Sequence, residues 1–366
     1  MSTPSTVSDR IDAPRRMWCD AHLDLAYLAM LGHDLSIEVG PGRERCASLP
    51  DLAAAPVGLC LATIYLEPGL APGADGRMPP WGYRDRDDLE HASRAARRQL
   101  DWYRAEEDAG RIRIVRSRED LERVEEASAP ASGTPLAVVL LVEGADGIAG
   151  AADLPWWFDR GVRVLGLAWS RGTRAAGGNA TTEGLSEEGR ELVAACDDLG
   201  ILHDASHLSD RAFDDLLEAT PRRIVATHSN ARRLLGDPNA ARHLADRQIE
   251  AIAERDGAIG LNLYGRFLAR DRPATLEDAL DHVEALASIA GRNRVGLGSD
   301  LDGGFTTADL PEGVRHPADY GSLERGLAAR GWSAGDLEAF RCGTWLRILR
   351  ASLPDRPTSS PARPRR

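Results

Sequence analysis

The chain has 366 residues, a formal net charge of −12 and no lysine, so its 45 basic residues are all arginines. This negative balance argues against a nucleic-acid partner that is held through its phosphates. The longest apolar runs are about seven to nine residues, far short of the roughly 20 that a membrane-crossing helix needs, and the polar N-terminus lacks the apolar segment of a signal peptide. We therefore expect a cytoplasmic protein without a membrane partner.

Short apolar runs alternate with helix-patterned stretches along the chain. The runs that we expect to form buried strands lie at 17–21, 57–65, 136–142, 162–168, 200–204, 223–227, 257–263 and 294–299. The stretches that we expect to form helices lie at 84–107, 186–199, 209–219, 245–255 and 276–290. This alternation predicts a (β/α)8 barrel with insertions, in a single domain over residues 15–353. The alternative, an open doubly wound sheet, would carry a glycine-rich nucleotide-binding motif that the chain lacks.

The remaining segments are expected to be loops and chain ends. Residues 1–14 are expected to be flexible, and residues 354–366, rich in proline, arginine and serine, to form a disordered tail. The stretches 67–83 and 169–184 are expected to be long loops at strand ends, where functional residues concentrate. The cysteines form no CxxC pair and lie in apolar surroundings, which indicates buried thiols rather than disulfides.

Side chains that commonly bind metals follow several of the apolar runs. These residues are His22, Asp24, Glu143, His207 and His228. Because the carboxyl ends of parallel strands open onto one mouth of a barrel, the side chains are expected to meet there. Imidazoles and carboxylates gathered at one mouth would form a site for one or two divalent metal ions. The sequence therefore points to a metal-dependent hydrolase.

Two of these residues, and Asp204 near them in the sequence, also have a structural interpretation. Asp24 is placed to cap the helix that follows it, and Glu143, which is costly to bury unpaired, could pair with Arg163. Asp204 could accept the far N–H of a metal-binding histidine or cap the next helix. If the site holds two metals, the absence of lysine excludes a carbamylated lysine as the bridge, and Glu143 is the candidate.

Two further predictions concern the strand ends. After the last predicted strand, Asp300 faces the same mouth and suits proton transfer or the capture of a substrate amine. Asp302 better fits an Asp-Gly turn. His203 alternates with its neighbour Asp204 along an extended chain, so we expect it to face away from the mouth in a structural role.

Several short motifs occur in order along the chain. They are Asp20-Ala-His22-Leu-Asp24, Val142-Glu143-Gly144, Asp204-Ala-Ser-His207, His228-Ser-Asn-Ala-Arg, Arg242-His-Leu-Ala-Asp, Gly260-Leu-Asn-Leu-Tyr264 and Gly298-Ser-Asp300-Leu-Asp302-Gly. Together they resemble the membrane (renal-type) dipeptidase family, the M19 metallopeptidases, from about Trp18 to Leu353. The resemblance implies a (β/α)8 barrel that holds two zinc ions per chain.

The resemblance also implies a role for each metal ligand. It implies that His22 and Asp24 bind one zinc ion, that His207 and His228 bind the other, and that Glu143 bridges the two ions. A hydroxide that bridges both ions would attack the amide bond of a dipeptide, including dipeptides with a C-terminal D-residue.

The same resemblance assigns residues to the substrate. Asp300 would meet the substrate amino group and pass a proton to the leaving amine. Arg242 would hold the substrate carboxylate, a task that suits a two-pronged guanidinium, and Tyr264 and Trp169 would belong to the same substrate site. The expected partners are a small dipeptide-like substrate and, at most, a second copy of the chain in a homodimer.

The chain departs from the family pattern at Trp169. Family members with dipeptidase activity often carry a histidine there that stabilises the oxyanion, and the loss of one such donor typically costs about 3–4 kcal/mol. Asp146 also stands where a histidine is common, and the segment between His228 and Arg242 is slightly longer than usual. The alternatives to a dipeptidase are a metallohydrolase of the same fold that acts on another amide, an ester or a lactam, and a metal-binding homologue without activity.

Overall fold

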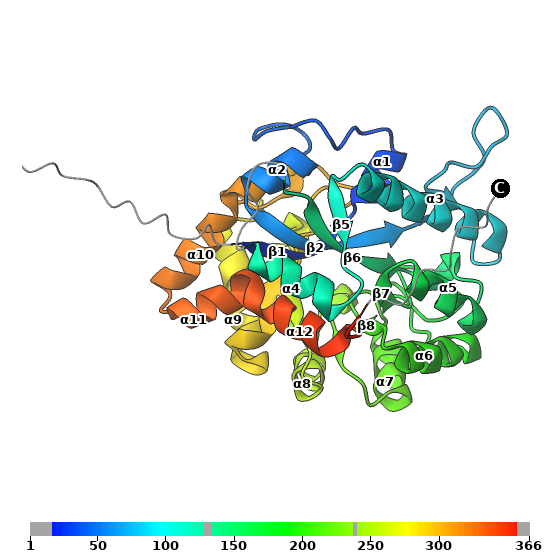
Figure 1. Cartoon of the computed structure of the whole chain (residues 1–366). Helices are drawn as coiled ribbons and strands as arrows, with labels where there is room; N and C mark the ends of the chain where they lie inside the picture. Colours follow the sequence, from blue (N-terminus) through cyan, green and yellow to red (C-terminus); the bar gives the residue numbers. More distant parts are fainter. Residues whose placement is uncertain (1–16, 128–133, 237–239, 357–366) are drawn as a thin grey trace, which may run out of the picture.

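Parallel strands form a nearly closed barrel with helices around it in the computed structural model, which describes residues 17–127, 134–236 and 240–356 (Figure 1). The barrel strands are β1 (Trp18–Leu23), β2 (Val57–Tyr65), β6 (Leu136–Glu143), β7 (Val162–Gly166), β8 (Leu202–Asp204), β9 (Ile224–Val225), β10 (Ile259–Leu261) and β11 (Val295–Leu297). They follow the order β10-β11-β1-β2-β6-β7-β8-β9, and a parallel bridge between Ala226 and Ile259 joins the two ends of this row. The barrel fold and all the predicted strands are confirmed.

The barrel interior is filled by side chains from strands on opposite sides of the ring. One hydrophobic cluster includes Leu59 of β2, Val139 of β6, Leu202 of β8, Val225 of β9 and Trp345 of α12 (Thr344–Ser352). Strands from opposite sides can contribute to one cluster only if these side chains point inward. Because side chains alternate along a strand, Glu143 shares the inward face with Val139, and its carboxylate enters the barrel at the strand end.

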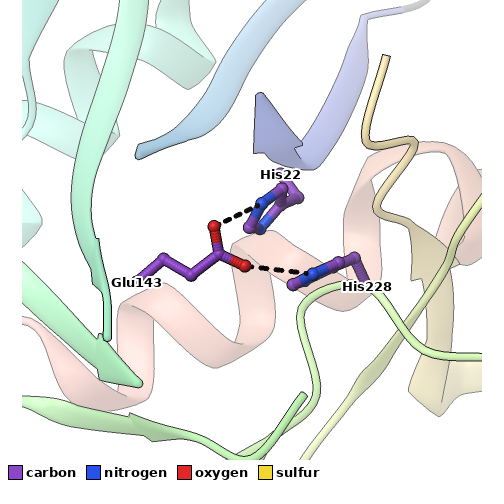
Figure 2. Close-up of side chains that lie close together, drawn as sticks. All are labelled: His22, Glu143 and His228. Atoms are coloured by element: carbon purple, nitrogen blue, oxygen red, sulfur yellow. Dashed lines mark ion pairs between the residues drawn. The ribbon is translucent and has the colours of Figure 1, made fainter. Parts of the chain in front are cut away.

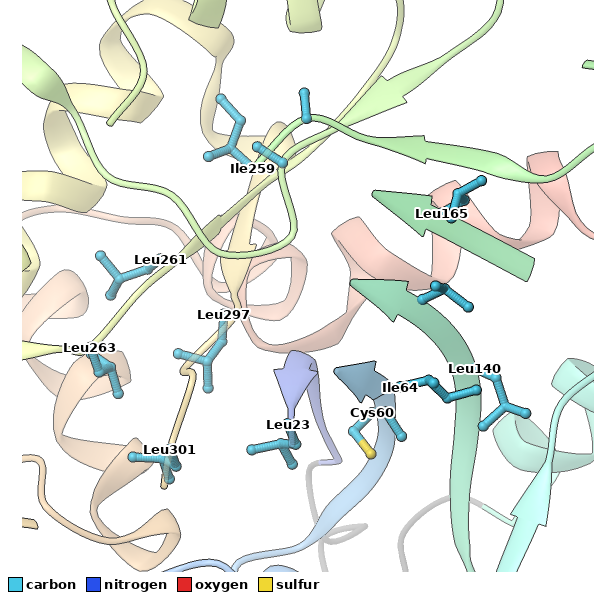
Figure 3. Close-up of a cluster of buried hydrophobic side chains, with 14 of the residues drawn as sticks. Leu23, Cys60, Ile64, Leu140, Leu165, Ile259, Leu261, Leu263, Leu297 and Leu301 are labelled. Carbon is cyan, nitrogen blue, oxygen red and sulfur yellow. The ribbon is translucent and has the colours of Figure 1, made fainter. Parts of the chain in front are cut away.

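The opposite faces of the same strands pack against the surrounding helices. Figure 3 shows part of this second cluster, in which Cys60, Ile64 and Leu140 alternate with the inward-facing residues of β2 and β6. Each barrel strand is buried along its whole length, as expected for a parallel sheet with both faces covered.

The predicted helices are present with ends within a few residues of those expected. They are α3 (Leu89–Asp108), α6 (Glu187–Leu199), α7 (Asp210–Ala219), α8 (Asp246–Glu254) and α9 (Leu276–Ala290). The predicted start of α3 at residue 84 was wrong, because the Arg84 carbonyl instead accepts a hydrogen bond from the backbone N–H of Gly69. Serine side chains cap α6 and α7: Ser186 accepts from the N–H of Gly189, and Ser209 from that of Ala212.

Further short helices and strands were not predicted. The additional helices are α1 (Leu25–Met30), α2 (Leu49–Ala54), α4 (Arg118–Glu126), α5 (Leu154–Asp159), α10 (Tyr320–Ala329), α11 (Ala334–Glu338) and α12. Within the predicted loop 67–83, β3 (Glu67–Pro68) and β4 (Gly82–Tyr83) form a two-stranded sheet, and β5 (Ile112–Ile114) pairs with the start of β6. The predicted loop 169–184 contains no helix or strand of its own.

Other predictions can be compared directly with the structure. All five cysteines are free and buried, as predicted. Within the described ranges, no helix combines the length and apolar character that crossing a membrane requires. The predicted flexible residues 1–14, and residues 357–366 of the predicted tail, lie outside the described residues.

Candidate metal centre

Glu143 is the central side chain of a buried cluster at the carboxyl end of the barrel. Its Oε2 lies 3.6 Å from Nε2 of His22, whereas its Oε1 lies 3.0 Å from Nε2 of His207 and 3.3 Å from Nε2 of His228. Figure 2 shows the carboxylate between His22 and His228, with one oxygen turned toward each. The two oxygens of a single carboxylate therefore face two different groups of possible metal ligands.

The first group has the dimensions of a metal site. Nε2 of His207 and Nε2 of His228 are 3.0 Å apart, and both lie within 3.3 Å of Glu143 Oε1. In a tetrahedral zinc site with bonds of about 2.0–2.1 Å, neighbouring ligand atoms are about 3.3 Å apart. The three atoms therefore form a triangle that one zinc ion could cap.

The second group surrounds His22. Its Nε2 is buried and has no hydrogen-bond partner within residues 17–127, 134–236 and 240–356, although it lies 3.9 Å from Oδ1 of Asp24. A carboxylate oxygen of Asp300 also lies within 4.8 Å of ligand atoms of both residues. A buried nitrogen without a partner is costly, and a metal ion bound here would provide one. The residues present thus fit a second ion, and all five predicted ligands come together.

The electrostatic environment favours a cation. Burial lowers the pKa of His207 to about 4 and also depresses that of His228, so both imidazoles are neutral donors. Burial also opposes a charge on His22, but the carboxylate of Glu143 outweighs it and raises the pKa of His22 to about 10. Burial likewise opposes the charge on Glu143, yet the neighbouring imidazoles hold its pKa well below the usual range. The carboxylate of Glu143 therefore favours a positive charge next to it, either a protonated His22 or a bound metal ion.

Hydrogen bonds fix which nitrogen of each histidine points toward this centre. Oγ1 of Thr227 lies 3.0 Å from Nδ1 of His228, 3.4 Å from Nδ1 of His22 and 2.7 Å from Oδ2 of Asp204. A hydroxyl has one hydrogen and two lone pairs. Because a carboxylate can only accept, the hydroxyl donates to Asp204 and accepts the N–H of both imidazoles. Nε2 is then the nitrogen that each histidine turns toward a metal.

His207 is oriented by a different residue. Its Nδ1 lies 3.0 Å from Oδ1 of Asn179, which belongs to the loop 169–184. Sequence reasoning missed both Asn179 and Thr227. Thr227 directly precedes His228 at a strand end, which could have indicated it, but nothing in the glycine-rich loop distinguishes Asn179.

The structural alternatives for Asp24 and Glu143 are not supported. Asp24 occupies the N-cap position of α1, but its side chain makes no capping hydrogen bond and accepts one from the Thr63 hydroxyl instead. Burial raises its pKa to about 6, against the opposing effect of His22. Arg163 donates to backbone carbonyls and is not paired with Glu143.

The structure also decides the roles of three other polar residues. Asp204 accepts hydrogen bonds from Ser206 and Thr227, so its carboxylate reaches the histidines through these two hydroxyls, and within the described residues its side chain caps no helix. His203 points away from the centre, with Nε2 2.8 Å from Asp197 of α6, as predicted. Asp146, which stands where a histidine is common, accepts from the Tyr83 hydroxyl.

Asp300 and Asp302 lie in different surroundings. The carboxylate of Asp300 accepts from Nδ2 of Asn262 at 2.8 Å, and burial raises its pKa to about 7. The buried carboxylate of Asp302 accepts the backbone N–H of Cys46 at 2.9 Å and that of Ala47 at 2.7 Å. Asp302 therefore holds a loop, whereas Asp300 remains beside the histidine cluster.

A cavity of about 540 Å³ opens onto this centre. Arg242, Tyr264 and Trp169, predicted as substrate-binding residues, line it together with Glu143 and His207. A larger cavity, of about 720 Å³, lies between residues 73–82 and α3, but its lining has no comparable group of metal ligands. The chemistry of the lining, rather than size, identifies the 540 Å³ cavity as the site.

Arg242 is held rigidly in the wall of this cavity. Its Nη1 donates to the Ser206 carbonyl at 3.0 Å and to Oγ of Ser229 at 3.2 Å, and its Nη2 donates to the His228 carbonyl at 2.8 Å. Among the residues that the structure describes, its buried Nε has no hydrogen-bond partner. The guanidinium is therefore fixed beside His228, and two of its five N–H groups take no part in these hydrogen bonds.

Aromatic side chains line the rest of the cavity. The Trp169 ring lies 5.3 Å from the Tyr65 ring and 6.0 Å from the His207 ring. The Tyr264 ring stacks on Phe305 at 4.5 Å. Trp169 thus lies in the cavity wall between Tyr65 and His207.

Comparisons with known proteins agree with this geometry. The family model for membrane dipeptidases (peptidase family M19) matches residues 14–358. An uncharacterized protein in the pqqA 5′ region of Klebsiella pneumoniae is 33% identical over 66% of this chain and 89% of its own length. Dipeptidase aclJ of Aspergillus oryzae is 31% identical over 58% of this chain, but only 50% of its own length is matched.

A solved structure also resembles this chain in its three-dimensional fold. It is a metallopeptidase from Rhodobacter sphaeroides with a bound phosphinate mimic of the dipeptide L-Ala-D-Ala. It is 28% identical to this chain and superimposes with a TM-score of 0.78 over 92% of this chain and 99% of its own. The chain therefore belongs to the membrane dipeptidase family, peptidase family M19, a family of metal-dependent dipeptidases.

Proposed function

We propose that this chain hydrolyses the amide bond of dipeptides at a binuclear zinc centre that Glu143 bridges. The observation that carries the proposal is the position of one carboxylate between two groups of donors, with Oε2 toward His22 and Oε1 toward His207 and His228. The chain has no lysine to serve as an alternative bridge. His22 and Asp24 would hold one ion, and His207 and His228 the other.

The protein residues give the centre its position and its charge. When bound, two zinc ions would polarise the scissile carbonyl and lower the pKa of a shared water. Glu143, Asp24 and the neutral imidazoles of His207 and His228 supply the donor types that zinc prefers. Thr227 keeps the Nε2 atoms of His22 and His228 directed inward.

Two charged residues are placed for the ends of a dipeptide. Arg242 has N–H groups beyond those that bind the Ser206 and His228 carbonyls, so it can hold the substrate carboxylate. Asp300 lies beside His22 and Asp24, and its pKa of about 7, raised by burial, suits the transfer of a proton to the leaving amine. The dipeptide mimic bound by the Rhodobacter sphaeroides metallopeptidase supports including a C-terminal D-residue among the substrates.

Metal content and dipeptide turnover test the proposal together. The purified protein should contain about two zinc equivalents, and it should hydrolyse L-Ala-L-Ala or L-Ala-D-Ala in a zinc-dependent way that a chelator abolishes. His207→Gln should lose one equivalent. The matched control is His203→Gln, because His203 is also buried but faces Asp197.

Either of two results would overturn the proposal. One is an unchelated wild-type protein without bound divalent metal. The other is a fully metal-loaded protein that hydrolyses no dipeptide but cleaves an ester or a lactam.

A further inference from the structure

We propose that the preferred dipeptide carries an acidic side chain, which Arg171 binds at the mouth of the cavity. This inference rests on the proposed dipeptidase function and names the substrate class for the same site. It starts from the charged residues that line the cavity, which are Asp24, Glu67, Glu143, Arg171, Arg242 and Asp300.

Arg171 differs from the other charged residues of the lining. Each of the others has a partner. Asp24 accepts a hydrogen bond from the Thr63 hydroxyl, Glu67 from the Tyr27 hydroxyl, and Asp300 from the Asn262 amide. Glu143 contacts the histidines, and Arg242 donates to backbone carbonyls. Arg171 is exposed and makes no ion pair or hydrogen bond with the described residues. Its guanidinium is therefore available to a ligand.

The loop that carries Arg171 is firmly held. A side chain at Gly178 would collide with the carbonyl oxygens of Trp169 and Ser170, so only glycine permits this close packing of the loop on itself. The loop is also fixed to the metal centre, because the N–H of Asn179 donates to the His207 carbonyl at 2.8 Å. Arg171 thus has a defined position relative to the ligands.

The guanidinium lies at the rim of the cavity, against the neighbouring loop. A Cβ atom built on Gly69 would be 3.7 Å from Nη1 of Arg171, so the side chain extends over the backbone of residue 69. Glu67 lies in the same rim, but its carboxylate accepts from the Tyr27 hydroxyl and makes no ion pair with Arg171. The positive charge of Arg171 therefore remains uncompensated.

The chemistry of a dipeptide then suggests what Arg171 binds. Arg242 and Asp300 are placed for the carboxylate and the amine that every dipeptide has, so Arg171 is left for a side chain. The faces of Trp169 and Tyr65 form an apolar wall on the way from the metal ligands to the rim. Methylene groups can pack on that wall while a terminal carboxylate reaches the guanidinium, which describes a glutamyl or aspartyl side chain.

Matched pairs of dipeptides test the inference, because glutamate and glutamine differ in charge but hardly in size. The zinc-loaded enzyme should be assayed with Ala-Glu against Ala-Gln, and with Glu-Ala against Gln-Ala, using both L- and D-residues at the C-terminal position. In at least one pair, kcat/KM should favour the acidic dipeptide by about five- to tenfold, mainly through KM, since the contact is made equally in ground and transition states.

Substitutions identify Arg171 as the source of the preference. Arg171→Gln should abolish the preference within each pair, and Arg171→Glu should reverse it. The control is Arg98→Gln, which removes an exposed arginine outside this cavity and should keep the preference.

The possible failures can be told apart. Efficient hydrolysis of dipeptides without any acidic preference, or a preference that survives Arg171→Gln, would overturn this inference but leave the dipeptidase function standing. Hydrolysis of none of the dipeptides would overturn the proposed function itself.

Discussion

Replacing Thr227 with valine should weaken metal binding although Thr227 is not a metal ligand. Valine has nearly the shape of threonine, so the substitution removes the hydroxyl and leaves the packing of this fully buried position intact. The hydroxyl donates to Asp204 and lies 3.0 Å from Nδ1 of His228 and 3.4 Å from Nδ1 of His22. Its loss would leave both imidazoles without the acceptor that keeps their protons on Nδ1.

The size of the effect follows from these contacts. A buried donor left without an acceptor costs about 1–3 kcal/mol, and the His228 contact is the shorter of the two. Changes to the partners of metal-binding histidines typically lower metal affinity 10- to 100-fold, which is about 1.4–2.7 kcal/mol. The two estimates agree, so we expect Thr227→Val to weaken zinc binding by 10- to 100-fold.

The assay is a metal titration of the apoprotein against a chromophoric chelator, repeated with Co²⁺ so that the visible spectrum reports the ligand geometry. Thr227→Ser is the matched control, because it retains the hydroxyl, and it should bind within a few-fold of wild type with the same Co²⁺ spectrum. Wild-type affinity in Thr227→Val, or an equal loss in both variants, would refute the role assigned to the hydroxyl.

Three further predictions concern the ligands and the cavity. Glu143→Gln should reduce the metal content, measured by elemental analysis, toward zero, whereas His207→Gln should retain about one equivalent. The reason is that only a bridging carboxylate serves both ions. Equal metal contents in the two variants would show that Glu143 is not a bridge. Trp169→His should raise KM for dipeptides without increasing kcat, because the indole packs between Tyr65 and His207 as a wall; a clear gain in kcat would mean that the missing oxyanion donor limits the wild-type enzyme. Metal binding at pH 8 should release about one proton from His22, because its pKa of about 10 keeps it protonated in the apoprotein. The affinity for metal should therefore rise with pH up to about 10. Calorimetry in buffers of different ionisation enthalpy would detect the released proton, and a pH-independent affinity would contradict the prediction.

Much of the fold, and the set of residues that gather at the candidate metal centre, could be predicted from the sequence. Apolar runs long enough for buried strands alternate with amphipathic stretches, and this local pattern determines the (β/α)8 barrel. Glu143 could be singled out because a carboxylate at the end of an unbroken apolar run is costly without a partner. The opposite orientations of His203 and Asp204 followed from the period-two alternation of side chains along a strand.

Other features depended on contacts between segments far apart in the sequence. Thr227 contacts His22 across 205 positions of the chain, and Asn179 reaches His207 from a loop without regular structure. The pairing of each Glu143 oxygen with its own histidines also appears only when the barrel closes.

The unpaired charge of Arg171 could not be predicted from the sequence either, because any of the 45 arginines could have formed an ion pair with a nearby carboxylate. The sequence by itself determined which residues stand at the strand ends, since strand periodicity and the cost of burying charge act locally. Only the tertiary structure decided which of those residues share a proton, a hydroxyl or an open cavity, because hydrogen bonds and ion pairs depend on distances of a few ångströms that loops and ring closure set.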